Sequence, residues 1–229
     1  MTNPDPTSAA RRAADRRPRM TAGLAFLGVS ALVLIQVTNF GRADLWIGEG
    51  GIVETLSFGL WAISALVCLM AAVRAKRARL AWLLGGLVVA ILCARELDIQ
   101  KAFFDWNAGK PANYLDSEIP FGERALVFAV FVAPALCVLG GFALVMARRF
   151  LAAWRAGEIW PRDFVIWLAL IVPITLLDKF HKYAGGLGVA ESHFWIATTL
   201  EECLELSLAL YVLLVILRAW RRDVLGRTP

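Results

Sequence analysis

The chain has 229 residues, a hydrophobic fraction of 59% and a formal net charge of +5. Soluble globular domains are roughly 45 to 50% apolar. This larger apolar share and the mean hydropathy of +0.63 predict a membrane protein. The basic residues lie in short clusters between apolar runs and form no continuous basic face, which argues against nucleic acid as a partner. Membrane lipids are the expected partners, and a homo-oligomer is a candidate assembly.

Six long apolar runs predict an all-α fold, a polytopic bundle of six transmembrane helices. An arginine-rich, proline-containing tail at 1–19 precedes the bundle and is expected to be disordered. The transmembrane domain is predicted at 20–222, and a second short tail at 223–229. The expected spans are about 20–40, 52–73, 80–98, 125–147, 164–181 and 195–217.

Charge alternates between the loops. Most of the 24 Lys and Arg residues fall in the first tail or directly after the second, fourth and sixth spans. Because Lys and Arg are enriched in cytoplasmic loops, both termini are predicted to be cytoplasmic. The expected location is the cell inner (plasma) membrane, and most acidic residues then lie toward the outer (periplasmic) face.

The sixth span begins with three carboxylates, Glu201, Glu202 and Glu205, in an otherwise apolar helix. At about 100° per residue, they share one arc of the helix. Charged side chains inside a membrane helix usually have partners on other helices and mark a functional site. Counting back from Arg218 at about 1.5 Å per residue places Glu205 about 20 Å from the cytoplasmic end, in the outer half of the membrane.

Three other predicted spans carry ionisable residues at a similar depth by the same count. These residues are Glu54, Arg95, Glu96, Asp98, Asp178, His181 and Lys182. Carboxylates outnumber basic residues in this layer. The excess favours a shared proton, a bound cation or a cationic ligand over a purely structural ion-pair network.

Asp178 and His181 are three residues apart on one helix, so they face the same way. A divalent metal is therefore a candidate cofactor. Its candidate ligands are Asp178, His181, Glu201 and Glu205. The candidate acids, bases and ligands are Glu202, Glu205, His181 and Asp178. The candidate substrate contacts are Arg95, Glu54, Glu96, Asp98 and Lys182.

The predicted layer lies near the outer face, whereas carriers usually bind their cargo near the midplane with broken helices. We therefore favour a membrane-embedded enzyme that performs hydrolysis or group transfer on a lipid-like or outer-face substrate. A metal ion is a candidate participant in this reaction. A proton- or cation-coupled transporter is the first alternative. A membrane assembly or interaction protein is the second.

Two further patterns lie outside the sixth span. Helical spacing aligns Glu54, Ser57, Trp61 and Ser64 into one polar stripe on the second span. The long outer loop at about 99–123 contains the aromatic run at 102–106. We expect this loop to be either a rim of the site or an interfacial anchor.

Overall fold

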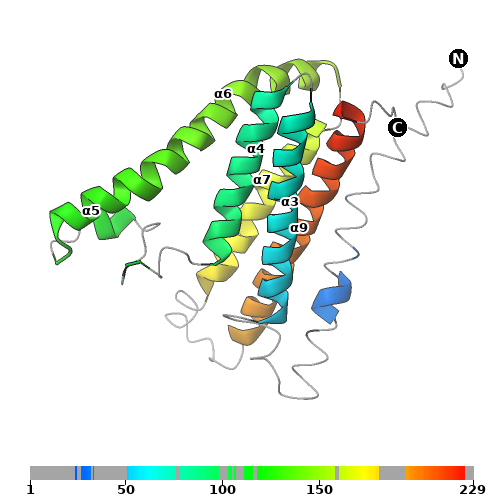
Figure 1. Cartoon of the computed structure of the whole chain (residues 1–229). Helices are drawn as coiled ribbons and strands as arrows, with labels where there is room; N and C mark the ends of the chain where they lie inside the picture. The colour runs from blue at the N-terminus through cyan, green and yellow to red at the C-terminus, as the bar shows by residue number, and fades with distance from the viewer. Residues whose placement is uncertain are drawn as a thin grey trace, which may run out of the picture. The chain divides into compact units, whose positions relative to one another are not determined.

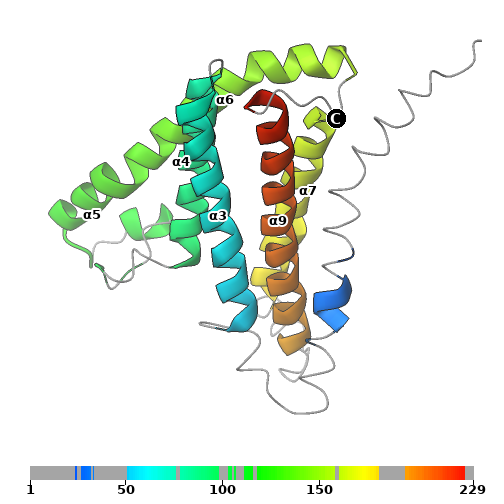
Figure 2. The ribbon, with the colours of Figure 1, turned by 45° about the vertical axis from the view of Figure 1, so that its right-hand side comes forward.

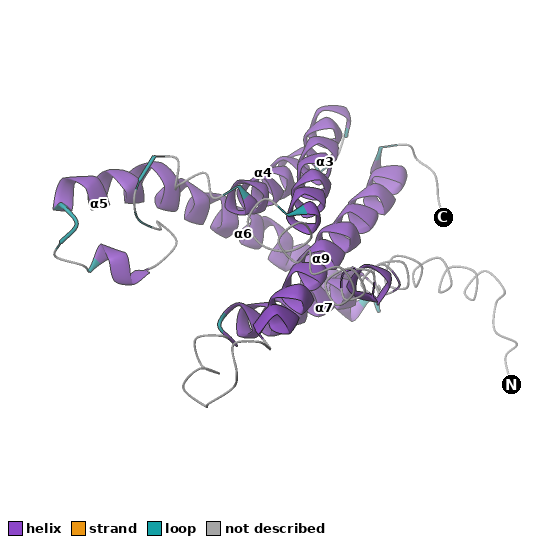
Figure 3. Cartoon of the chain, turned by 90° about the horizontal axis from the view of Figure 1, so that it is seen from below, coloured by secondary structure: helices purple, strands orange, loops and turns teal. Residues whose placement is uncertain are grey.

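The structure is a computed structural model of the chain, and it describes residues 24, 27–31, 33, 51–75, 78–97, 103, 104, 106, 111–115, 118–157, 160–180 and 194–224. Within these residues every regular element is a helix (Figure 3). The all-α class is therefore confirmed. The chain divides into two compact units, Met1–Leu60 with Ala152–Pro229, and Trp61–Leu151.

The helices follow the predicted order along the chain (Figure 1). The long helices are α3 (Ile52–Arg74), α4 (Arg79–Glu96), α6 (Ala133–Arg155), α7 (Trp160–Asp178) and α9 (Phe194–Asp223). The short elements are η2 (Pro111–Tyr114), α5 (Phe121–Val127) and the π-helical turn η3 (Phe128–Val132). Of the first predicted span, residues 24, 27–31 and 33 are described, and they are helical.

Three helical stretches are long and apolar enough to cross a membrane: Ile52–Arg74, Phe121–Arg155 and Trp160–Leu177. Large apolar side chains such as Leu144 and Leu176 are exposed along them. Apolar surface of this extent is typical of helices that contact lipid and not water. The chain is therefore a transmembrane protein.

The fourth predicted span belongs to a longer helix than expected, because α5, η3 and α6 join into a stretch of 35 residues. The π-helical turn ends at Val132, two residues before Pro134. In a regular α-helix the ring of Pro134 would clash with the carbonyl group of Val130, and a locally widened turn relieves that clash. The helix ends near Gly157, which adopts a positive φ of 71° that an L side chain would disfavour.

Glycines bring the helices of the second unit into close contact. A Cβ atom added at Gly86 of α4 would lie 3.1 Å from the Cβ atom of Cys68 on α3. A Cβ atom at Gly85 would lie 3.6 Å from the Phe142 ring of α6, which is ordinary van der Waals contact, so Gly86 is the position that requires a glycine. Small residues at such positions allow membrane helices to approach closely. They explain why α3 and α4 run side by side in Figures 1 and 2.

In the first unit, α7 and α9 pack along each other (Figure 2). A separate apolar cluster joins the beginning of α3 to α9 and to the helical residues near position 30. Its buried members are Val33, Val53, Cys203 and Leu206, with Val29 and Leu60 packed against them. This cluster is the part of the core that positions the glutamates of α9.

Candidate functional site

Of the three glutamates of α9, Glu202 lies at the edge of a buried strip, and Glu201 and Glu205 lie further round the helix. Thr199 and Cys203 are fully buried, whereas Glu201, Glu202 and Glu205 are half-buried. Glu202 is nearest to this strip, about 60° from Thr199 around the helix axis. Each glutamate takes part in at least one hydrogen bond, ion pair or electrostatic interaction. The carboxylates are thus partly enclosed by protein.

Glu54 lies at the level of these glutamates. Its neighbour Val53 packs in the same apolar cluster as Cys203 and Leu206 of α9. Glu54 is half-buried, occupies the first turn of α3 and also has an interaction partner. Of the predicted site residues, Glu54 and the α9 glutamates are therefore brought to one level of the first unit.

The last residue of α7, Asp178, lies at the end of its helix that adjoins the beginning of α9. The two helices pack against each other and run in opposite directions (Figure 2). The backbone of Asp178 is therefore at the same end of this helix pair as the glutamates. The side chain of Asp178 and all of His181 and Lys182 lie outside the described residues.

The predicted site residues of α4 belong to the second unit. Arg95 is exposed, and Glu96 is half-buried. The Trp61 indole Nε1 of α3 donates a hydrogen bond of 3.1 Å to Glu96 Oε1. Because Trp61 is only 3% exposed, this bond is shielded and fixes the position of the carboxylate. Asp98 lies outside the described residues.

The polar stripe predicted on α3 is a buried surface. Ser57, Trp61 and Ser64 are 2%, 3% and 0% exposed. The hydroxyl oxygens of Ser57 and Ser64 have no hydrogen-bond partner among the described residues. A buried hydroxyl group without a partner destabilises a fold by about 1 to 3 kcal/mol relative to a paired one.

We expect Ser64→Ala to raise the free energy of unfolding by about 1 kcal/mol, because it removes a buried hydroxyl group that lacks a partner. Thermal unfolding in nanodiscs measures this change. The matched control is Ser207→Ala on α9, since the Ser207 hydroxyl donates a 2.8 Å bond to the Cys203 carbonyl oxygen. A loss of stability in Ser64→Ala equal to that of the control would show that the Ser64 hydroxyl has a partner.

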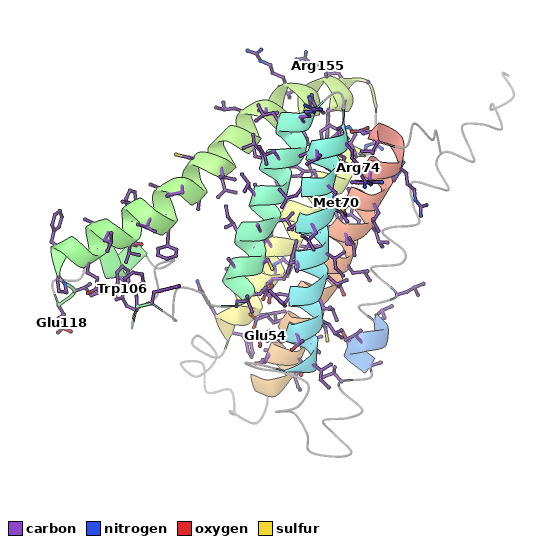
Figure 4. The ribbon with its side chains drawn as sticks, viewed as in Figure 1. Glu54, Met70, Arg74, Trp106, Glu118 and Arg155 are labelled. Atoms are coloured by element: carbon purple, nitrogen blue, oxygen red, sulfur yellow. The ribbon has the colours of Figure 1, made fainter. Side chains whose placement is uncertain are left out.

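An aromatic segment, comprising the described residues 103, 104, 106, 111–115 and 118–120, packs on the first turns of α5 and η3. The Trp106 indole Nε1 donates a 2.6 Å hydrogen bond to Glu123 Oε1. Arg124 Nη1 donates a 2.8 Å bond to the carbonyl oxygen of Tyr114, and burial raises the pKa of the Tyr114 hydroxyl. Figure 4 shows Trp106 beside this helix start. The predicted outer loop is therefore attached to the helix that follows it.

Metal ligation is not visible in the described part of the chain. Among those residues no three His, Cys, Asp or Glu side chains come together in an arrangement suited to a metal ion. Two of the four predicted ligands, His181 and the Asp178 carboxylate, are not among them. The divalent metal thus stays a prediction.

Sequence reasoning missed the two tryptophan-carboxylate pairs, Trp61 with Glu96 and Trp106 with Glu123. For the pair of Trp61 and Glu96 the sequence does contain an indication. Trp61 is the single tryptophan within the second predicted span, and an indole N–H needs an acceptor when it is buried. Neither pair could be assigned without knowing which segments are neighbours in the fold.

In comparisons with protein families, with curated proteins and with solved structures, the chain has no match.

Proposed function

We propose that this protein is a membrane-embedded enzyme that performs hydrolysis or group transfer on a lipid-like or outer-face substrate. The observation that carries the proposal is the set of three half-buried glutamates on α9, of which Glu202 is nearest to the buried Thr199 and Cys203, with Glu54 at the same level. Carboxylates held partly away from water are suited to general acid and base catalysis. Glu202 and Glu205 are the proposed acid and base.

The remaining predicted residues complete the proposed site. Asp178 and His181 act as further acid, base or ligand groups, and Arg95 contacts an anionic group of the substrate. The other proposed substrate contacts are Glu54, Glu96, Asp98 and Lys182. A lipid-like substrate would enter this site from the bilayer and not from the aqueous phase.

A divalent metal is compatible with part of the proposed ligand set. Glu201 and Glu205 are one turn apart on α9, so both carboxylates project from the same side of the helix. Together with Asp178 and His181 they would give an oxygen-rich set with one imidazole. Such an ion, when bound, supplies a Lewis acid and an activated water.

The proposal includes a six-span topology, with both termini in the cytoplasm and the protein in the inner membrane. α4 and α9 are the two additional proposed spans that the structure describes over most of their length. Charged residues lie at both ends of each helix: Arg79 opposite Arg95 and Glu96 on α4, and Arg218, Arg221, Arg222 and Asp223 opposite the glutamates on α9. The stretch between the two ends is apolar, which is the pattern expected if the charges face a protein interior or the interface.

We expect Glu205→Gln to lower the rate of lipid turnover by about 10² to 10⁴-fold, the usual contribution of a general acid or base. The wild-type protein and each variant are reconstituted in liposomes of mixed phospholipids. Mass spectrometry then follows the loss or transfer of lipid head groups. Asp223→Asn is the matched control, because Asp223 is an exposed carboxylate at the opposite end of α9. Elemental analysis of both variants tests whether the glutamate also holds a metal.

Two results would contradict the enzyme proposal. Counterflow of a cation driven by a pH step, lost in Glu205→Gln and without lipid turnover, would identify a coupled carrier instead. This alternative is favoured by the excess of carboxylates at the level of Glu54 and the α9 glutamates. A fixed protein partner, retained through purification without turnover or transport, would indicate an assembly function.

A further inference from the structure

The aromatic segment is held on the helix that follows it by ring contacts as well as hydrogen bonds. Tyr114 packs edge-on against Trp106 and Phe128, with ring centroids 5.4 and 6.0 Å apart. Phe104 packs edge-on against Phe131 at 5.9 Å. Contacts of this kind stabilise by about 0.5 to 1.5 kcal/mol each beyond the burial of apolar area. The segment therefore has a defined inner side and a defined outer side.

The outer side carries three large apolar residues. Phe103, Leu115 and Phe121 are 67%, 86% and 77% exposed. Burying such a side chain is worth about 1.5 to 3 kcal/mol, so three of them left in water represent a substantial unfavourable contribution. A surface of this kind is expected to be covered by another phase or another molecule.

The position of this surface along the helix identifies the bilayer as its cover. Leu126 and Val130, on the same helix, are 57% and 55% exposed and belong to a stretch apolar enough to span the membrane. A hydrocarbon core of about 30 Å corresponds to about 20 residues of helix, and counting back from Arg148 ends at Phe128. Phe121 and the aromatic segment then lie at the bilayer interface, the level at which Trp and Tyr residues are enriched.

We propose that Phe103, Leu115 and Phe121 insert into the bilayer leaflet at the Phe121 end of this helix, and that the lipid surface is their partner. The apolar rings and the leucine side chain enter the boundary between head groups and acyl chains. The polar atoms of Trp106 stay bonded to Glu123. This inference concerns the second unit and is independent of the proposed catalytic site.

The test is spin labelling of Leu115→Cys in nanodiscs of phosphatidylcholine and phosphatidylglycerol, with Glu118→Cys as the control. Leu115 is so exposed that the substitution disturbs no packing, and Glu118 is an exposed polar position on the same segment. Both variants carry Cys137→Ser, because Cys137 is the exposed native thiol among four free cysteines. Power saturation measures the collision rate of each label with O₂, which partitions into lipid, and with a water-soluble nickel chelate.

We expect the ratio of O₂ to nickel collision rates to be higher at position 115 than at position 118. A ratio at 115 equal to that at 118 would show that the surface lies in water and would overturn the proposal. Low collision rates with both reagents at 115 would show that protein covers it, as in contact with a second copy of the chain, and would overturn it equally. Neither outcome depends on lipid turnover, so a failure here is distinguishable from a failure of the enzyme proposal.

Discussion

Gly86→Leu is expected to lower the free energy of unfolding by about 3 kcal/mol, because a larger side chain forces α3 and α4 apart. The Cβ atom alone would lie 3.1 Å from the Cβ atom of Cys68 and 3.3 Å from Leu69 Cδ2. The first neighbour is bonded directly to the backbone and cannot move aside without moving the helix. For a chain of this size the loss corresponds to a decrease in Tm of roughly 6 to 12 °C.

The matched control is Gly140→Leu on α6, where an added Cβ atom meets nothing within 4 Å. We expect this variant to unfold at the wild-type temperature or slightly above it, since leucine favours the helix more than glycine does. Near-UV circular dichroism in nanodiscs follows the transition in both variants. Equal melting temperatures for the two variants would contradict the close approach of α3 and α4.

A milder pair keeps this test informative if Gly86→Leu fails to fold. Gly86→Ala adds only the Cβ atom, and its contact with Cys68 is tighter than ordinary van der Waals contact. Cys68→Gly removes the opposing atom. We expect the double variant to recover part of the stability that Gly86→Ala loses, beyond what the two single changes predict by addition.

Sequence reasoning located the beginnings of the helices better than their ends. The predicted span at 52–73 matches α3, and 80–98 is close to α4, because Gly50 and Gly51 come directly before the first apolar run, Arg79 comes before the second, and charged residues end both runs. The predicted spans end at about 147 and 217, whereas the helices are longer, since α6 continues to Arg155 and α9 to Asp223. Hydropathy marks where the hydrocarbon core ends, whereas Arg, Leu and Ala residues continue a helix into the interface.

For the candidate site, spacing along one helix was informative and contacts between helices were not. The arc of Glu201, Glu202 and Glu205 and the stripe of Ser57 and Ser64 follow from a period of 3.6 residues. The depth of Glu54 was predicted by counting residues along its span, but its place beside α9 required the cluster of Val53 with Cys203, which no periodicity contains. Helix neighbours are chosen by packing of many weak contacts, and a single sequence does not reveal that choice.

Substitutions of Trp61, which donates a hydrogen bond to Glu96, are expected to have the second large effect on the free energy of unfolding. This effect has two parts, the packing of the side chain and the hydrogen bond. Trp61→Ala removes a side chain that is 3% exposed and is expected to lower the free energy of unfolding by about 3 to 5 kcal/mol. Trp61→Phe keeps most of the ring but removes the indole N–H. Because the acceptor is a carboxylate, that change alone should lower stability by about 1.5 to 3 kcal/mol.

A double-mutant cycle with Glu96→Gln separates the bond from the packing. If the indole N–H and the carboxylate act together, Trp61→Phe should matter less once Glu96 is an amide, which is a weaker acceptor than a carboxylate. The melting temperatures of the four proteins in nanodiscs give the coupling. Strict additivity would mean that the charge of the carboxylate adds nothing to the 3.1 Å bond, and would contradict the charge-assisted part of the expected effect. Coupling would instead make Trp61 the residue that holds the Glu96 carboxylate at the C-terminal end of α4, where the proposed substrate contacts require it.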